Sequence, residues 1–339
     1  MDEKHLQLMT QLVSSLASLK LTFAAISLLL LAVVAANLLG WPYAEAIAAP
    51  VLLLTVNLIF AILHQPAFKR DSSLLLFHIA LAMLLPVALY GSLAGFQGRF
   101  ELPEGATFAP GQLVVTKQGP LHPYSLDELS LSLQAMEATY VPGKRAQRLR
   151  ARVWLDDEQW VVAEHLPLVW RGYRINVSKN IGFSALLQFT DGAGQTLTHG
   201  VNFPWLAANE LRQANEVALL GEPFWLKLEG VESMLESNMD AVDFVPPAAA
   251  FLVLRQGERR LELRPGQEIA INGGRLRYLG LGSWQGFEII YDPAKPFLLA
   301  IGVILCAAMG WYFYRRFSRY DWAASTATNR SSQSPTDAS

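Results

Sequence analysis

Four long runs of apolar residues constrain what this 339-residue chain can fold into. A helix needs about 20 mostly apolar residues to cross the hydrocarbon core of a bilayer. Runs of that kind are found at 21–40, 46–63, 74–95 and 294–316. The first two contain no charged residue, and the third contains one histidine, His78. The sequence therefore predicts a membrane protein with four transmembrane helices in contact with the lipid bilayer.

The basic residues next to these runs predict the orientation of the chain. Cytoplasmic flanks of membrane proteins carry an excess of Lys and Arg. The short connection at 40–45 has neither residue, whereas the N-terminal flank, the second connection and the C-terminal flank are basic, through Lys4, Lys20, Lys69, Arg70, Arg315, Arg316 and Arg319. We therefore expect a multi-pass protein of the cell inner (plasma) membrane with both termini in the cytoplasm.

Between the third and fourth runs the hydrophobic pattern changes to alternation. Apolar and polar residues alternate at 112–117, 131–141, 147–155, 160–164, 172–179, 185–190, 223–229, 249–255, 260–264 and 287–291. Such alternation, interrupted by Gly-rich turns, is typical of antiparallel strands. It predicts a large antiparallel β-rich domain, sandwich-like or barrel-like, with a helix as one interpretation of 204–220.

Together these patterns predict five parts in order along the chain. They are a cytoplasmic leader at 1–20, three transmembrane helices within 21–96, a periplasmic β-rich domain at 97–293, the fourth transmembrane helix at 294–316 and a disordered cytoplasmic tail at 317–339.

Composition excludes several classes of function. The net charge is −2, which argues against nucleic acid as a partner. The single cysteine, Cys306, lies in an apolar run and cannot form a disulfide within the chain. Asp240 and Asp243 are the nearest approach to a carboxylate pair, but no nucleophile, base or metal set accompanies them. We therefore do not expect the chain to be an enzyme on its own.

Three segments resemble the ResB/CcsB family of membrane subunits in the System II pathway of cytochrome c biogenesis. The first is LLLFH at 74–78, followed by GFQG at 95–98 and LPEG at 102–105. The second is LPL at 166–168 with GYR at 172–174. The third is WQGFEI at 284–289 with YDP at 291–293, and the fourth run with Arg315 and Arg316 follows it. Where the family commonly has Asp-Pro-Gly before the last span, this chain has Ala294 after Pro293.

The resemblance implies that the chain handles haem, carrying it across the membrane for covalent attachment to apocytochrome c. It implies two partners, the apocytochrome and a CcsA/ResC-type membrane subunit with a tryptophan-rich loop, which this chain lacks. The chain would then be one subunit of a holocytochrome c synthetase complex.

His78 is the residue that best fits haem ligation. Imidazole is a common axial ligand of haem iron, and an ionisable group within a span usually marks a pathway or a partner. Counted from Leu74, His78 lies roughly 6 Å into the span, and by its place in the motif it resembles the family's intramembrane haem ligand. The alternative is a structural histidine that bonds to another helix, for instance at Asn57.

The remaining histidines have weaker claims. His64 ends the second run on the same side as His78 and is a secondary haem-ligand candidate. His5, His122, His165 and His199 have no metal-ligand spacing.

The second hypothesis for the whole chain is a membrane scaffold without haem, in which the periplasmic β-rich domain organises another membrane complex.

Overall fold

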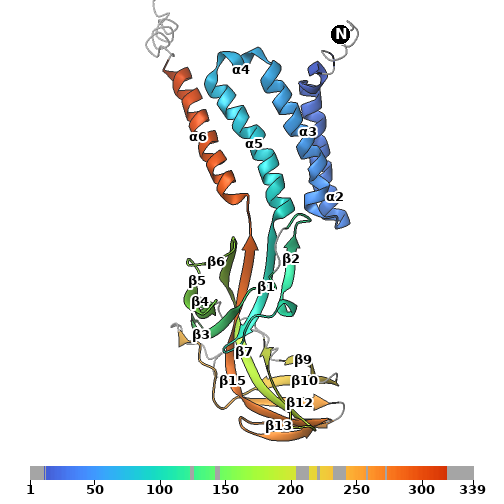
Figure 1. Ribbon diagram of the computed structural model, residues 1–339, viewed down its shortest axis with the longest axis vertical. Coiled ribbons are helices and arrows are strands. Elements are labelled where there is room, and N and C mark those ends of the chain that lie inside the picture. The colour runs from blue at the N-terminus through green and yellow to red at the C-terminus, as the bar shows by residue number, and fades with distance from the viewer. Residues whose placement is uncertain are drawn as a thin grey trace, which may run out of the picture. The chain divides into compact units, whose positions relative to one another are not determined.

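The computed structural model describes residue 11 and residues 13–122, 126–141, 146–203, 214–219, 222–231, 242–256, 259–271 and 273–318. The chain divides into two compact units (Figure 1). One contains helices and comprises Met1–Gly95, Gly119–His122 and Asp292–Ser339. The other contains strands and comprises Phe96–Gln118 and Pro123–Tyr291.

The helical unit confirms that the chain has helices long and apolar enough to cross a membrane. Among the described residues, four helices are of this kind: α2 (Leu19–Leu39), α3 (Tyr43–His64), α5 (Ser72–Ala94) and α6 (Lys295–Phe317). A short helix, α4 (Pro66–Arg70), connects α3 to α5. Helix α2 packs on α3, α3 on α5, and α5 on α6, so the helices form a row (Figure 1). The contact between α5 and α6 joins segments about 200 residues apart in the sequence.

One buried amide attaches α2 to α3. Asn57 on α3 is 3% exposed. Its Oδ1 accepts a hydrogen bond from Thr22 on α2 at 2.6 Å, and its Nδ2 donates to the carbonyls of Leu16 and Ser18 at 2.6 and 3.2 Å. An amide left without partners in an apolar surrounding costs free energy, so these bonds explain how an apolar span accommodates Asn57.

Most of the described basic residues of the helical unit gather at one end of the row. Arg315 near the end of α6 lies 3.6 Å from the carboxylate of Asp71, which precedes α5, so α5 and α6 run antiparallel. The helix directions place the other basic residues at this end as well (Figure 1); they are Lys20, Lys69, Arg70 and Arg316. Lys295 is at the opposite end, at the start of α6.

The segment 119–122 ends α5 by satisfying its last carbonyl groups. The backbone N–H of Gly119 donates to Gly95 and that of Leu121 to Leu93, each at 2.9 Å. The Nδ1 atom of His122 lies 3.2 Å from the carbonyl oxygen of Ala94. A Cβ atom on Gly119 would lie 2.0 Å from the Leu93 carbonyl oxygen, so this close approach requires glycine. His122 therefore has a structural role at a helix end.

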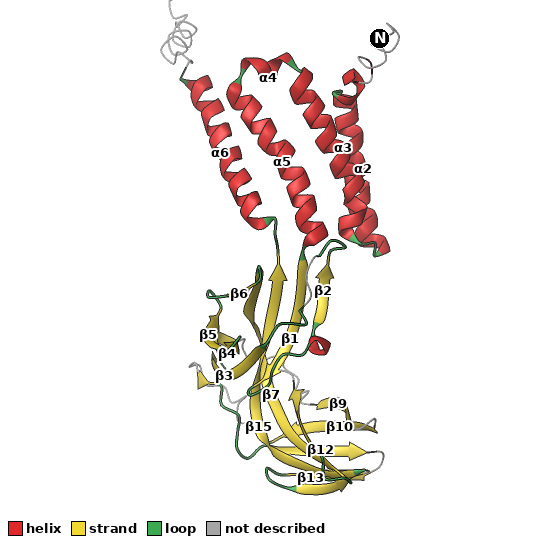
Figure 2. Cartoon of the chain, in the orientation of Figure 1, coloured by secondary structure: helices red, strands yellow, loops and turns green. Residues whose placement is uncertain are grey.

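The strand unit contains three sheets among its described residues, and all pairings are antiparallel. The largest sheet has the order β2-β1-β15-β7-β6, with β14 paired to β15 and β8 to β7. The second has the order β13-β12-β10-β9 and the third the order β11-β3-β4-β5 (Figure 2).

The strands have the following bounds. They are β1 (Phe96–Pro103), β2 (Val114–Gln118), β3 (Leu131–Tyr140), β4 (Ala146–Leu155), β5 (Glu158–Ala163), β6 (Leu168–Trp170), β7 (Tyr173–Asp191), β8 (Thr196–Phe203), β9 (Ala214–Leu219), β10 (Glu222–Glu229), β11 (Val242–Asp243), β12 (Phe251–Gln256), β13 (Arg259–Leu263), β14 (Glu268–Ile271) and β15 (Gly274–Tyr291). A 3-10 turn, η1 (Pro110–Gln112), precedes β2.

The predicted antiparallel β structure is confirmed, with differences in detail. Two expected strands, at 172–179 and 185–190, are parts of one 19-residue strand, β7. The helix considered at 204–220 is wrong at 214–219, which forms β9; residues 204–213 and 220 lie outside the described residues. Three sheets share one core in place of the expected single sandwich or barrel-like sheet.

The core of the strand unit is continuous across the three sheets. Its fully buried members include Tyr173 and Phe183 on β7, Phe224 on β10 and Phe287 on β15. Alternation along most strands turns one face to this core, whereas β7 at 181–185 and β15 at 283–287 are buried on both faces. The interior therefore unites segments that are distant in the sequence.

Candidate functional site

The candidate site in the helical unit begins with the residue that starts α5. Asp71 is the N-cap, and its side chain accepts hydrogen bonds from the backbone N–H groups of Ser73 and Leu74 at 3.0 and 3.3 Å and from the Ser73 hydroxyl at 2.6 Å. The Ser73 hydroxyl, the two N–H groups and Arg315 lower the pKa of Asp71 below its ordinary value, against an opposing effect of burial. Asp71 is thus held as a carboxylate at neutral pH, which is the favoured charge at a helix N-terminus.

His78 lies on the second turn of α5, six residues after its first residue and thus about 9 Å along the helix axis. Its Nδ1 atom is 2.8 Å from the carbonyl oxygen of Leu74, one turn earlier. A carbonyl oxygen can only accept, so this bond places the ring proton on Nδ1. The neutral ring then has its lone pair on Nε2, for which no hydrogen bond is found among the described residues.

The surroundings of the His78 ring are aromatic. The ring of Phe68 on α4 lies 4.6 Å away between centroids, with a 58° angle between the planes. Phe77, the preceding residue, makes an edge contact at 5.4 Å. The side chain of His78 is half-buried, and the buried residues Ala82 and Leu89 share its side of the helix, four and eleven positions later.

The structure does not pair His78 with Asn57, the alternative that the sequence left open. Asn57 bonds to Thr22 and to the chain just before α2, as described above. His78 bonds to the backbone of its own helix. A bond within one helix does not connect two helices, so the structure assigns no bridging role to His78 among the described residues.

His64 resembles His78 in its local bonding but differs in exposure. It is the last residue of α3, and its Nδ1 lies 3.0 Å from the Phe60 carbonyl oxygen. Its ring stacks on Phe60 at 6.1 Å, and its side chain is exposed. No contact between the rings of His64 and His78 is found in the part of the chain that the structure describes.

Other ionisable residues form no metal centre in the described chain. No group of three or more His, Cys, Asp or Glu residues comes together there in a way that could hold a metal ion. His165 and His199 are exposed, and His5 and Asp240 lie outside the described residues. Cys306 is exposed on α6.

The segments that carry the family resemblance have identifiable structural roles. Glu104 accepts a hydrogen bond from the backbone of Met136 at 2.7 Å, which joins the end of β1 to β3. Trp284 is 1% exposed and donates through Nε1 to the carbonyl of Phe203 at 2.9 Å. Asp292 accepts from the N–H groups of Ala294 and Lys295 at 3.1 and 3.2 Å and so begins α6.

Ala294, which departs from the family pattern, lies at a close contact between helices. It is fully buried, and a Cβ atom on Gly91 of α5 would lie 2.7 Å from the Cβ of Ala294. A small residue at 294 and a glycine at 91 therefore allow the ends of α5 and α6 to approach each other. Sequence reasoning missed this contact, as it missed Phe68 beside His78.

Comparison of the sequence with protein-family models and with curated proteins finds no match.

Proposed function

We propose that this chain is a membrane subunit that handles haem during cytochrome c biogenesis, with His78 as an axial ligand of the haem iron. The observation that carries the proposal is the bonding of the His78 ring. Its Nδ1 is committed to the Leu74 carbonyl, so Nε2 retains the lone pair that an iron atom requires. Ligating histidines usually donate their second nitrogen to a carbonyl or carboxylate in this way, because the bond fixes the tautomer and the ring orientation.

The charge distribution of the helical unit supports the direction of transport. His78 is near the end of α5 at which the basic residues gather, and the positive-inside rule assigns such an end to the cytoplasm. We infer that the strand unit is on the periplasmic side of the inner membrane. His78 would then meet haem as it enters from the cytoplasm, and His64 at the same end would assist entry.

A second membrane subunit completes the proposed site. One imidazole occupies one axial position of haem iron, so a CcsA/ResC-type partner would supply the other. The row of helices leaves α6 with exposed apolar side chains, among them Leu299 and Val303 at 72% and 63% exposure. Such a surface suits lipid or a partner helix. The strand unit would brace that partner or position the apocytochrome.

The covalent chemistry would belong to other components. Thioether bonds form between the haem vinyl groups and the cysteines of the apocytochrome, and no described residue of this chain is placed to make or break them. The role of this chain would be to hold and orient haem, with His78 on the iron and the Phe68 ring beside it.

Spectroscopy of the purified complex tests the proposal. The full chain is co-expressed with its multispan partner, and the visible spectrum is recorded for the natural protein and for H78G and H64A. We expect H78G to lose or shift the Soret band, and added imidazole to restore it by occupying the vacated position. H64A tests whether the secondary candidate contributes, and the spectrum of H199G is the control, because His199 is an exposed histidine on β8 outside the helical unit.

The outcome separates the two functions considered for the chain. An H78G complex with unchanged haem content and Soret position would remove His78 as a ligand. A natural complex that contains no haem would favour the scaffold function, in which the strand unit organises another membrane complex. An H78G protein that fails to assemble is recognised by its loss of the partner on purification.

A further inference from the structure

The outer face of β4 presents a row of arginines. Residues on this strand alternate between the core and the opposite face. Leu149, Ala151 and Val153 face the core, and each is at most 1% exposed. Arg148, Arg150 and Arg152 are on the other face and are exposed.

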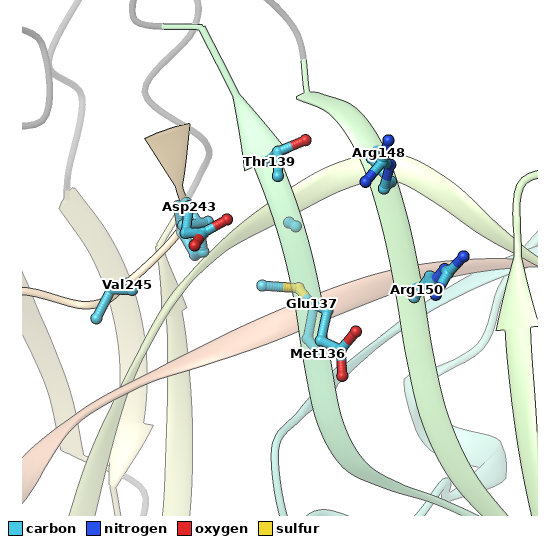
Figure 3. Close-up of a pocket in the computed structure, with 9 residues that line it drawn as sticks. Met136, Glu137, Thr139, Arg148, Arg150, Asp243 and Val245 are labelled. Carbon is cyan, nitrogen blue, oxygen red and sulfur yellow. The ribbon is translucent and has the colours of Figure 1, made fainter. Parts of the chain in front are cut away.

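Three neighbouring strands bring polar residues together at one end of this row. Asp243 on β11 pairs with Thr139 on β3, and Thr139 pairs with Arg148 on β4. Glu137 on β3 pairs with Arg150 in the same way. Directly paired residues share a face of the sheet. These five residues, with Val245, line a pocket of about 410 Å³ (Figure 3).

Charges in this pocket are only partly paired. The Glu137 carboxylate lies 3.5 Å from Arg152, which does not line the pocket. No ion pair or hydrogen bond of the side chains of Arg148 and Arg150 is found among the described residues. Two guanidinium groups therefore lie at the pocket without a carboxylate partner among the residues that the structure describes. On adjacent outward positions of a strand they are about 7 Å apart along the backbone.

We propose that this pocket binds a carboxylate group of an organic ligand through Arg148 and Arg150. A guanidinium group presents two parallel N–H donors that match the two oxygens of a carboxylate. The Thr139 hydroxyl lies between Asp243 and Arg148 in the paired row and supplies a further donor. The volume lies within the range of about 300–1,000 Å³ that is typical of small-molecule sites.

The acidic residues of the pocket restrict the kind of anion. Glu137 and Asp243 line it together with the two arginines, so the four formal charges cancel. The second charge of a phosphate doubles both its attraction to the arginines and its repulsion by the carboxylates, so it brings no net gain, whereas the apolar side chains of Met136 and Val245 in the lining favour an anion with an organic group. The inference concerns the strand unit alone and does not depend on haem ligation by His78.

Ligand-observed NMR on the full chain in lipid nanodiscs tests this site, with benzoate as the probe. We expect benzoate to bind more tightly than benzylamine, benzyl alcohol or inorganic phosphate. R148Q and R150Q should each weaken benzoate binding by about tenfold, because each removes a charge-assisted pair of hydrogen bonds. R277Q is the matched control, since Arg277 is an exposed arginine of the same unit outside the pocket.

The substitution D243N gives a test of opposite sign. Removal of a negative charge from the pocket should strengthen benzoate binding several-fold, although it adds no new contact. Circular dichroism of each variant verifies that the fold is retained. Equal benzoate affinity in the natural protein and in a variant that combines R148Q with R150Q would overturn the proposal. Weaker binding in D243N, or tighter binding of phosphate or benzylamine, would also overturn it.

Discussion

Replacement of Trp284 by phenylalanine tests the role of a motif residue in holding the strand unit together. Trp284 is 1% exposed on β15, and its Nε1 donates to the Phe203 carbonyl on β8 at 2.9 Å. A Cβ atom on Gly182 of β7 would lie 2.6 Å from this Nε1 atom. The indole on β15 is thus enclosed by two paired strands, β7 and β8, that lie far from it in the sequence.

The expected cost of the substitution has two parts. Phenylalanine cannot donate, so the buried Phe203 carbonyl loses this partner, at a cost of about 1–3 kcal/mol. The smaller ring also leaves a cavity, which adds about 1–2 kcal/mol. The sum of about 2–5 kcal/mol corresponds to a fall in melting temperature of roughly 5–15 °C for a unit of this size.

Thermal unfolding of the full chain in nanodiscs, followed by the circular dichroism of its β-sheet, measures the effect. Trp154→Phe is the matched control, because Trp154 is 41% exposed on the outer face of β4. We expect this control to melt within about 2 °C of the natural protein, since surface substitutions rarely change stability by more than about 0.5 kcal/mol. Equal melting temperatures for the two variants would refute the reasoning that the buried hydrogen bond and packing of Trp284 stabilise the unit.

Three further predictions concern other parts of the chain. Gly91→Ala should destabilise the helical unit by about 1–3 kcal/mol, because its Cβ would lie 2.7 Å from the Cβ of Ala294. The control Gly302→Ala should leave the stability unchanged, because its Cβ would meet nothing within 4 Å. Thermal unfolding in detergent measures both. Burial raises the pKa of Tyr278 to about 12 from 10.0. The tyrosine of the unfolded chain therefore ionises first, and the stability of the folded chain should fall as pH rises from 10 towards 12. Tyr278→Phe should lessen this fall, which a pH series of melting curves measures. A variant that combines Ala193→Cys with Cys306→Ser has one cysteine, at an exposed position of the strand unit. In spheroplasts, a membrane-impermeant maleimide should label this cysteine, because the strand unit is proposed to lie outside the cytoplasm. Labelling only after lysis would reverse the proposed orientation.

Composition and periodicity predicted the four long helices and many of the strands. A run of apolar residues long enough to cross a bilayer has few alternatives to a helix, so all four long helices were expected within three residues of their observed ends. Alternation of apolar and polar residues identified many of the strands, because a strand with one buried face has an apolar residue at every second position. Six of the described strands were not predicted, because their local patterns are weak or short and the pairing partners decide their conformation: β1, β6, β8, β9, β11 and β14.

The amino-acid sequence by itself determined where the chain enters an apolar environment, because transfer of an uncharged run from water is a property of that run alone. It also determined that His78 belongs to such a run. Only the tertiary structure decided that Asn57 bonds to Thr22 and not to His78, and that Arg150 is opposite Glu137 while Asp243 joins the same face. These contacts depend on strand register and helix packing between distant segments, which no local pattern specifies.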